Sequence, residues 1–288
     1  MGDFLKIKLF TLIIFVLTMA SCVPQAQETK LRSPGSTYSP APGAPFRWNS
    51  SFLVSGLNVK ISEDFRNEFV PDDYDASGRD PIEQMMYQWN LADSRTYFSL
   101  SAQTTTNKNY SSLSQYQDGE LGIYKSYSWF SDVSSDALAI TQFFAIRRNA
   151  GSPSEYLELT HADIIVNYRD HDFSLNIFSG IDYDLPSVLI HELGHFIGLQ
   201  HADYFTNSVM QPYLGMRDAF RSLYPSDIST LGNLYNGASS LTASSGGQGL
   251  TKSSSRDEAV SGYFELRADG KCRHYIGHNF VGEHQIVH

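Results

Sequence analysis

Three histidines and one glutamate lie within residues 191–201 at a spacing that suits metal chemistry. His191 and His195 are four positions apart, so on a helix both imidazoles project from one face and can reach the same ion. Glu192 follows the first histidine, where its carboxylate can reach a water molecule bound to that ion. Gly198 can adopt positive φ and turn the chain back, which lets His201 supply a third nitrogen. Three neutral histidines leave the fourth tetrahedral position for water, which is typical of catalytic zinc and not of a closed structural site.

The alternative to a metal site is an amphipathic core helix with surface histidines. That interpretation is disfavoured because Glu192 lies in an otherwise apolar helix, and a buried charge needs a partner. Asp184 suits the N-cap of this helix and Pro186 its first turn, which predicts a helix over residues 184–200.

The remaining elements are predicted from hydrophobic periodicity. Helices are expected over residues 81–92 and 226–235, the second ended by Asn236-Gly237. Strands are expected over residues 57–61, 137–146 and 162–168. Because strands and helices are mixed without regular alternation, we expect an α+β fold.

Nine residues beyond His201 comes Met210, within Ser208-Val209-Met210-Gln211-Pro212. Together with the long histidine motif, this segment resembles the metzincin clan of zinc peptidases, which pair that motif with a Met-turn. The best match is the matrixin-like group, because Asp227 precedes Leu234-Tyr235-Asn236-Gly237. The resemblance is strong over residues 160–237 and weaker over residues 46–160. It implies a twisted mixed sheet, an active-site helix and a C-terminal helix.

The resemblance also implies an activity and its residues. We expect a zinc endopeptidase with one catalytic ion, in which zinc-bound water attacks the peptide carbonyl and Glu192 is the general base. An extended protein or peptide substrate would add to an exposed strand edge. Met210 would form an apolar floor beneath the ligands, and the segment after it would wall a substrate pocket through Pro212, Tyr213 and Leu214. The alternative function is a metal-containing envelope lipoprotein used for binding or adhesion, which would not need the general base.

The sequence departs from the usual metzincin patterns at two positions. Ala202 stands where matrixins usually carry Ser, and Pro212 occupies the place of a metal-binding Tyr in other metzincins, so no Tyr ligand is expected. A structural zinc site is not expected either, since His161 and His171 alone cannot close one and better suit surface or capping roles. Calcium is not indicated by any ligand set, although isolated carboxylates could bind it.

The N-terminus has the features of an export signal. Lys6 and Lys8 precede an apolar run of about nine residues, too short to span a membrane. Met19-Ala20-Ser21-Cys22 resembles a bacterial lipobox, which implies lipidation of Cys22 and a membrane anchor. Val23 in the next position favours the outer membrane by the same resemblance. If the lipobox is not used, the protein would be secreted.

The expected order along the chain is a signal peptide (1–21), a Pro-rich tether (22–45), a metallopeptidase catalytic domain (46–237), a Ser/Gly-rich linker (238–258) and a short His-rich tail (259–288). The tail carries Cys272 and four histidines. One interpretation has it fold back so that Cys272 or a histidine blocks zinc. We favour the other, a short ordered or frayed appendage, because Lys271-Cys272-Arg273 lacks the Pro and Gly context of the known matrixin switch.

Composition excludes several partners. The 288 residues include 21 Lys and Arg against 31 Asp and Glu, a net charge of −10, which argues against nucleic-acid binding. Two cysteines exclude a disulfide scaffold. We expect a monomer.

Overall fold

The computed structural model describes residues 44–176, 181–203, 206–242, 258–269, 271–276 and 279–285. Its strands are β1 (Phe46–Trp48), β2 (Lys60–Ser62), β3 (Thr104–Thr105), β4 (Gly122–Ser126), β5 (Ala137–Arg148), β6 (Tyr156–Asn167), β7 (Phe173–Ser174), β8 (Tyr183–Asp184), β9 (Glu258–Arg267), β10 (Lys271–Ile276) and β11 (Asn279–Gln285). Its α-helices are α1 (Glu63–Arg66), α2 (Pro81–Asn90), α3 (Leu185–Phe196) and α4 (Pro225–Thr242).

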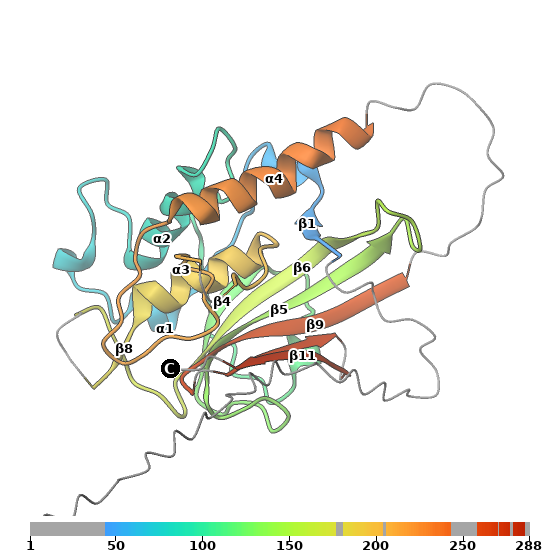
Figure 1. Cartoon of the computed structure of the whole chain (residues 1–288). Helices are drawn as coiled ribbons and strands as arrows, with labels where there is room; N and C mark the ends of the chain where they lie inside the picture. Colours follow the sequence, from blue (N-terminus) through green and yellow to red (C-terminus); the bar gives the residue numbers. More distant parts are fainter. Residues whose placement is uncertain are drawn as a thin grey trace, which may run out of the picture. The chain divides into compact units, whose positions relative to one another are not determined.

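One mixed sheet dominates the described residues. Its strand order is β11-β10-β9-β5-β6-β4-β2-β3, and β1 also pairs with β6. The strands from β6 to β3 run parallel, whereas β5 is antiparallel to β6 and β9 is antiparallel to β5. Helices α2, α3 and α4 lie together on one face of this sheet (Figure 1). The α+β class expected from the sequence is confirmed.

Residues 137–143 of β5 and 161–167 of β6 are all buried because both faces of the sheet are covered there. Along β6, Ile164 and Val166 join the core beneath the helices, while Ile165 between them joins an aromatic cluster on the opposite face. Successive side chains of a strand point to opposite faces, so a continuous apolar run is what a sheet buried on both sides requires. The cluster opposite the helices includes Tyr116, Trp129 and Phe130.

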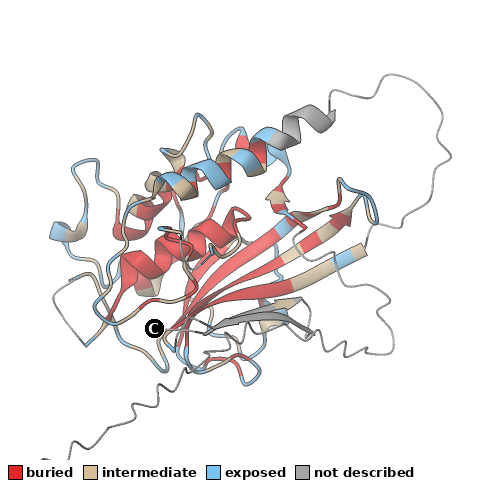
Figure 2. Ribbon diagram, in the orientation of Figure 1, coloured by how far each residue is buried: buried red, intermediate tan, exposed pale blue. Residues whose placement is uncertain are grey.

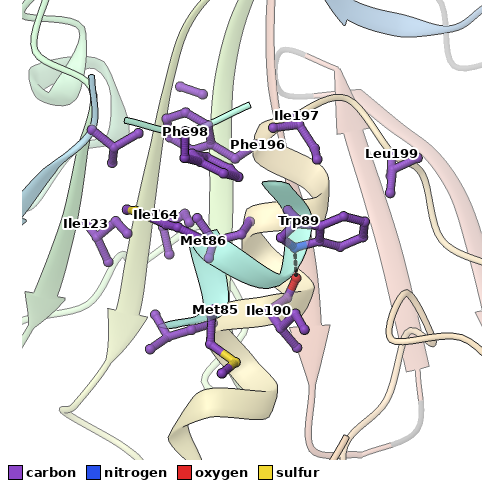
Figure 3. Close-up of a cluster of buried hydrophobic side chains, with 14 of the residues drawn as sticks. Met85, Met86, Trp89, Phe98, Ile123, Ile164, Ile190, Phe196, Ile197 and Leu199 are labelled. Carbon is purple, nitrogen blue, oxygen red and sulfur yellow. Dashed lines mark hydrogen bonds between the residues drawn. The ribbon is translucent and has the colours of Figure 1, made fainter. Parts of the chain in front are cut away.

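Helix α2 begins where its sequence satisfies the first backbone N–H groups. Asp80 accepts a hydrogen bond from the Glu83 amide, and the Glu83 side chain accepts one from the Asp80 amide, which together form a capping box. The helix packs on α3 through Trp89, whose Nε1 donates to the Ile190 carbonyl at 2.9 Å (Figure 3). Met86 lies beside it in the same buried cluster.

Helix α3 is buried along its whole length, between the sheet and the other helices (Figure 2). Asp184 caps it by accepting from the Ser187 amide at 3.1 Å, and Arg221 pairs with the same carboxylate. A helix that is apolar on most sides belongs in a core, and α3 is placed there by the strands below it and by α2.

Several predicted boundaries differ from the structure. The strand predicted over residues 57–61 starts only at Lys60, and Leu57 makes an isolated bridge to Phe98. Helix α3 ends at Phe196 instead of continuing to residue 200. Helix α4 does not end at Asn236 but continues to Thr242, and the Asn236 side chain accepts a hydrogen bond from Arg95 instead of capping the helix. No helix in the described part of the chain is long and apolar enough to cross a membrane.

The C-terminal tail also differs from the favoured interpretation. Residues 258–285 supply three strands, and β9 pairs with β5 along ten residue pairs from Ala137 to Arg147. The tail is therefore a continuation of the main sheet and not an appendage. This pairing joins segments more than 100 residues apart, which no local pattern in the sequence signals.

Candidate metal centre and active site

The three predicted histidine ligands converge on one point. The Nε2 atoms of His191 and His195 are 3.0 Å apart, those of His195 and His201 are 3.0 Å apart, and those of His191 and His201 are 3.2 Å apart. Two nitrogens held tetrahedrally at about 2.0–2.1 Å from zinc would be separated by roughly 3.3 Å. Within the described residues, this is the group of three or more His, Cys, Asp or Glu side chains whose ligand atoms cluster closely enough to hold a metal.

The protonation of two rings supports the fit to a metal ion. The Nδ1 atom of His191 lies 2.8 Å from the Val209 carbonyl oxygen, and that of His195 lies 2.8 Å from the Leu199 carbonyl oxygen. A carbonyl oxygen only accepts, so both Nδ1 atoms carry the proton and both neutral Nε2 atoms present lone pairs. Burial lowers the pKa of His191 to about 4, which keeps that ring neutral. The Nε2 lone pairs of His191 and His195 face each other at 3.0 Å and would repel unless a cation lay between them.

The end of α3 places the third histidine. Gly198 has φ +98°, its amide donates to the His195 carbonyl at 2.8 Å, and the Leu199 amide donates to the Gly194 carbonyl at 2.9 Å. These two bonds form a Schellman motif, which ends the helix and reverses the chain toward His201. The positive φ predicted for Gly198 is confirmed.

Aromatic side chains satisfy the last carbonyls of α3. Trp48 donates from Nε1 to the Phe196 carbonyl at 2.7 Å, and the Tyr235 hydroxyl donates to the Ile197 carbonyl at 2.8 Å. Carbonyls at a buried helix end need such partners, and these two bonds attach β1 and α4 to the metal-binding turn.

The segment around Met210 packs against α3 and orients one of the histidine ligands. The Val209 carbonyl orients His191, and the Met210 carbonyl accepts from the Ala202 amide at 2.9 Å. Met210 is buried against α3, so close to Gly194 that a Cβ there would lie 2.3 Å from the methionine sulfur. Asp227 of α4 fixes this turn by accepting from the Ser208 hydroxyl and the Val209 amide.

Glu192 lies beside the histidines, completely buried. Thr141 of β5 donates to the Glu192 carboxylate through Oγ1 at 2.5 Å from Oε2, and the same hydroxyl lies 3.0 Å from the Glu192 carbonyl oxygen. Burial raises the pKa of Glu192 to about 8, against the lowering effect of the Thr141 hydrogen bond. A cation held by the histidines would favour the ionised carboxylate.

Thr141 was not predicted as a site residue, although it interrupts the apolar run of residues 137–146. A polar side chain in a buried strand requires a partner, so this interruption was the available signal.

A small pocket lies beside His191. Tyr213 and Leu214 line it with Ser187, Val209 and Phe220, whereas Pro212 is buried but is not among the lining residues.

Two residues of the C-terminal tail also reach this region, and no sequence pattern indicated them. Leu266 of β9 lines the pocket, and the Phe264 ring stacks on His195 with ring centroids 4.4 Å apart and planes 6° apart.

A family model described as Matrixin matches residues 92–236, which is half of the chain and contains the three histidines, Glu192, the Met210 turn and Asp227. The chain belongs to the matrixin family. Matrixins are zinc metallopeptidases, so membership implies zinc and a protein or peptide substrate, and the three histidines are a group that could hold the metal. No curated protein matches the chain by sequence.

Other predicted residues lie away from the matrixin zinc site. His161 is buried, not on the surface, and its Nε2 lies 2.7 Å from Asp163 and 2.9 Å from the Tyr116 carbonyl. Desolvation opposes the charged form of His161, but the Asp163 carboxylate overcomes it and raises the pKa. His171 contacts the Ser135 carbonyl at 2.9 Å. Cys22 lies outside the described residues, as does the side chain of Cys272.

Proposed function

We propose that this matrixin is a zinc-dependent endopeptidase that hydrolyses proteins at the bacterial cell envelope, with Glu192 as general base. The observation that carries the proposal is the convergence of three histidine nitrogens, two of them with fixed lone pairs, beside a buried carboxylate. A protein that only bound a metal would have no use for that carboxylate at this place.

Zinc bound there would act as a Lewis acid and lower the pKa of its water toward about 7. Glu192 takes the proton of the attacking water and delivers it to the leaving amine. Thr141 holds Oε2 by a hydrogen bond and so orients the carboxylate, which leaves Oε1 as the atom that accepts the proton. An extended substrate would pair with β5 in the place that β9 takes in the structure, and the pocket lined by Tyr213 and Leu214 would receive one side chain.

The test is Glu192→Gln, assayed on a quenched peptide and on casein, with zinc content measured in the same samples. The substitution keeps the shape of the side chain and removes the base, so turnover should fall by about 10²- to 10⁴-fold with zinc retained. The control is Glu158→Gln, a partly buried glutamate paired with Arg148 on the sheet, which should leave turnover unchanged. Retained cleavage by zinc-loaded Glu192→Gln would refute the general-base role.

The envelope location is a separate part of the proposal and is supported by the sequence alone. Cys22 follows a lipobox-like sequence. Growth with labelled palmitate should label the wild-type chain and leave Cys22→Ser unlabelled. Equal labelling of the two proteins would exclude this anchor. A chain that binds zinc and localises to the envelope but cleaves no protein would favour the alternative of a binding or adhesion lipoprotein.

A further inference from the structure

Strand β9 covers the edge of the sheet that adjoins the zinc site. Strands β10 and β11 lie beyond β9, so without the tail β5 would be the edge strand of the sheet. Strand β5 carries Thr141, which contacts Glu192. An uncovered strand edge presents unpaired N–H and C=O groups and is a ready template for an extended peptide. In this chain the tail itself pairs with that edge, through β9.

The part of β9 at the zinc site is held from both sides. On one side Phe264 pairs in register with Thr141, and Leu266 pairs with Ala139, in antiparallel fashion. On the other side Phe264 pairs with position 274 of β10, and at the end of β9 the segment after Met210 contributes a parallel bridge between Tyr213 and Arg267, with the Leu214 amide donating to the Arg267 carbonyl at 3.4 Å. Strand β9 therefore pairs with β5 as a bound peptide would, and only its Arg267 end meets the pocket wall.

Its side chains fill the space in front of the catalytic residues. Phe264 stacks flat on His195, and Leu266 lines the pocket beside His191. The backbone of Leu266 also lies close enough to the Glu192 carboxylate to lower its pKa, although burial has the larger and opposite effect.

The exposure of the site reflects this cover. Glu192 has no exposed surface, and His191 and His195 are each 1% exposed. A peptide cannot reach a general base with no exposed surface unless part of the chain moves. Strand β9 is the natural candidate, because it lies beyond residue 236, where the matrixin match ends.

An ion pair and a backbone hydrogen bond tie β9 to the rest of the domain at this end. Arg267 is 3% exposed in its side chain and pairs with Asp136, as well as with Glu265 and Asp269 of the tail itself. The Ala268 amide donates to the Asp136 carbonyl at 3.0 Å. The strand is thus fastened directly after the two residues that cover the site.

We propose that β9 is an intramolecular inhibitor that occupies the substrate groove, and that it must leave before a peptide can be hydrolysed. The claim that β9 inhibits hydrolysis rests on the proposed function, whereas the covering of the site by β9 is tested by measurements that need no catalysis. It differs from the sequence-based idea of a tail inhibitor, because backbone pairing and Phe264 cover the site and neither Cys272 nor a histidine is required.

The experiment uses the full chain and compares Phe264→Ala with Val260→Ala. Val260 lies on the same strand, opposite Ala145 and away from the zinc site, so its truncation controls for a general weakening of β9. The first readout is the affinity of zinc-loaded protein for a fluorescent peptide hydroxamate, which binds zinc in the groove without being cleaved. The second is hydrogen exchange at the amides of β5 in zinc-free protein.

We expect Phe264→Ala to bind the probe about 10- to 100-fold more tightly than the wild type, since a buried ring contact that holds β9 in place is lost. Val260→Ala should stay within about threefold of the wild type, and β5 amides should exchange faster in Phe264→Ala. Equal probe affinity in all three zinc-loaded proteins would overturn the proposal. Tight probe binding by Phe264→Ala without turnover of any peptide would support the occlusion and refute the peptidase function.

A second arm guards against misfolding of the variant. A recognition sequence for a site-specific protease is inserted within residues 243–257, and the folded chain is cut there. A synthetic peptide of residues 258–269 is then added in excess to the cut protein. Cutting should raise probe affinity, and the peptide should lower it again in proportion to its concentration. No change after complete cutting and separation of the tail would overturn the proposal.

Discussion

Gly198→Ala is the substitution for which the structure gives the clearest magnitude. Gly198 has φ +98°, a conformation that costs an L-residue about 1–2 kcal/mol. A Cβ at this position would lie 2.2 Å from the Phe46 carbonyl oxygen and 2.9 Å from its carbonyl carbon. These are backbone atoms of β1 and cannot rotate away, so overpacking adds about 1–3 kcal/mol. We expect the free energy of unfolding to fall by about 2–5 kcal/mol.

Gly78→Ala is the matched control. Gly78 has φ +75°, and a Cβ there would meet nothing within 4 Å, so it carries the conformational cost alone, about 1–2 kcal/mol. Urea denaturation of both variants measures the difference, and competition with a chromophoric chelator measures zinc affinity. Zinc affinity should fall by about 10- to 100-fold in Gly198→Ala only, because the Leu199 carbonyl that orients His195 lies in the same turn. Equal losses of stability in the two variants, or unchanged zinc affinity in Gly198→Ala, would refute the reasoning.

Three further outcomes are expected. Asp227→Ala leaves the Ser208 hydroxyl and the Val209 amide without their carboxylate partner, so the free energy of unfolding should fall by about 2–5 kcal/mol in urea titrations. Thr141→Val keeps the side-chain shape but removes the donor to the general base, so kcat should fall about tenfold in steady-state assays while zinc content stays unchanged. Burial alone would raise the pKa of Glu120, but hydrogen bonds from two lysines, a threonine and a tyrosine lower it to about 2. Stability from Glu120 is therefore complete above about pH 4.5 and is lost as the pH falls toward 2. Glu120→Gln should reduce that loss in denaturation measured across this range, and an identical pH dependence in both proteins would contradict the assignment.

The zinc site was predictable because its determinants are local. The i,i+4 spacing of His191 and His195 places both rings on one helix face, and Gly198 ends that helix where its positive φ permits the turn. Such features depend on helix geometry and on the backbone freedom of glycine, and both are encoded within eleven residues. The Met210 turn was found by resemblance for a similar reason, since it follows the third histidine closely in sequence.

The environment of the general base was not predictable in this way. Thr141 reaches Glu192 from 51 positions away, and Phe264 reaches His195 from 69 positions away. His161 was expected at the surface but lies buried beside Asp163, because the strand that carries both is covered on each face. Contacts of this kind depend on strand register, which is fixed only when the sheet assembles.

Sequence alone determined that this chain carries three histidines and a glutamate in the order a zinc peptidase needs, on a helix that its own caps define. Only the tertiary structure decided that the active-site edge of the sheet is occupied by β9, the first strand of the chain's own C-terminal tail. The physical reason is that helix faces and turns follow from neighbours in sequence, whereas any strand of suitable pattern can add to a free sheet edge. Which segment does so is settled by the pairing of β9 with β5 and by the packing of Phe264 on His195.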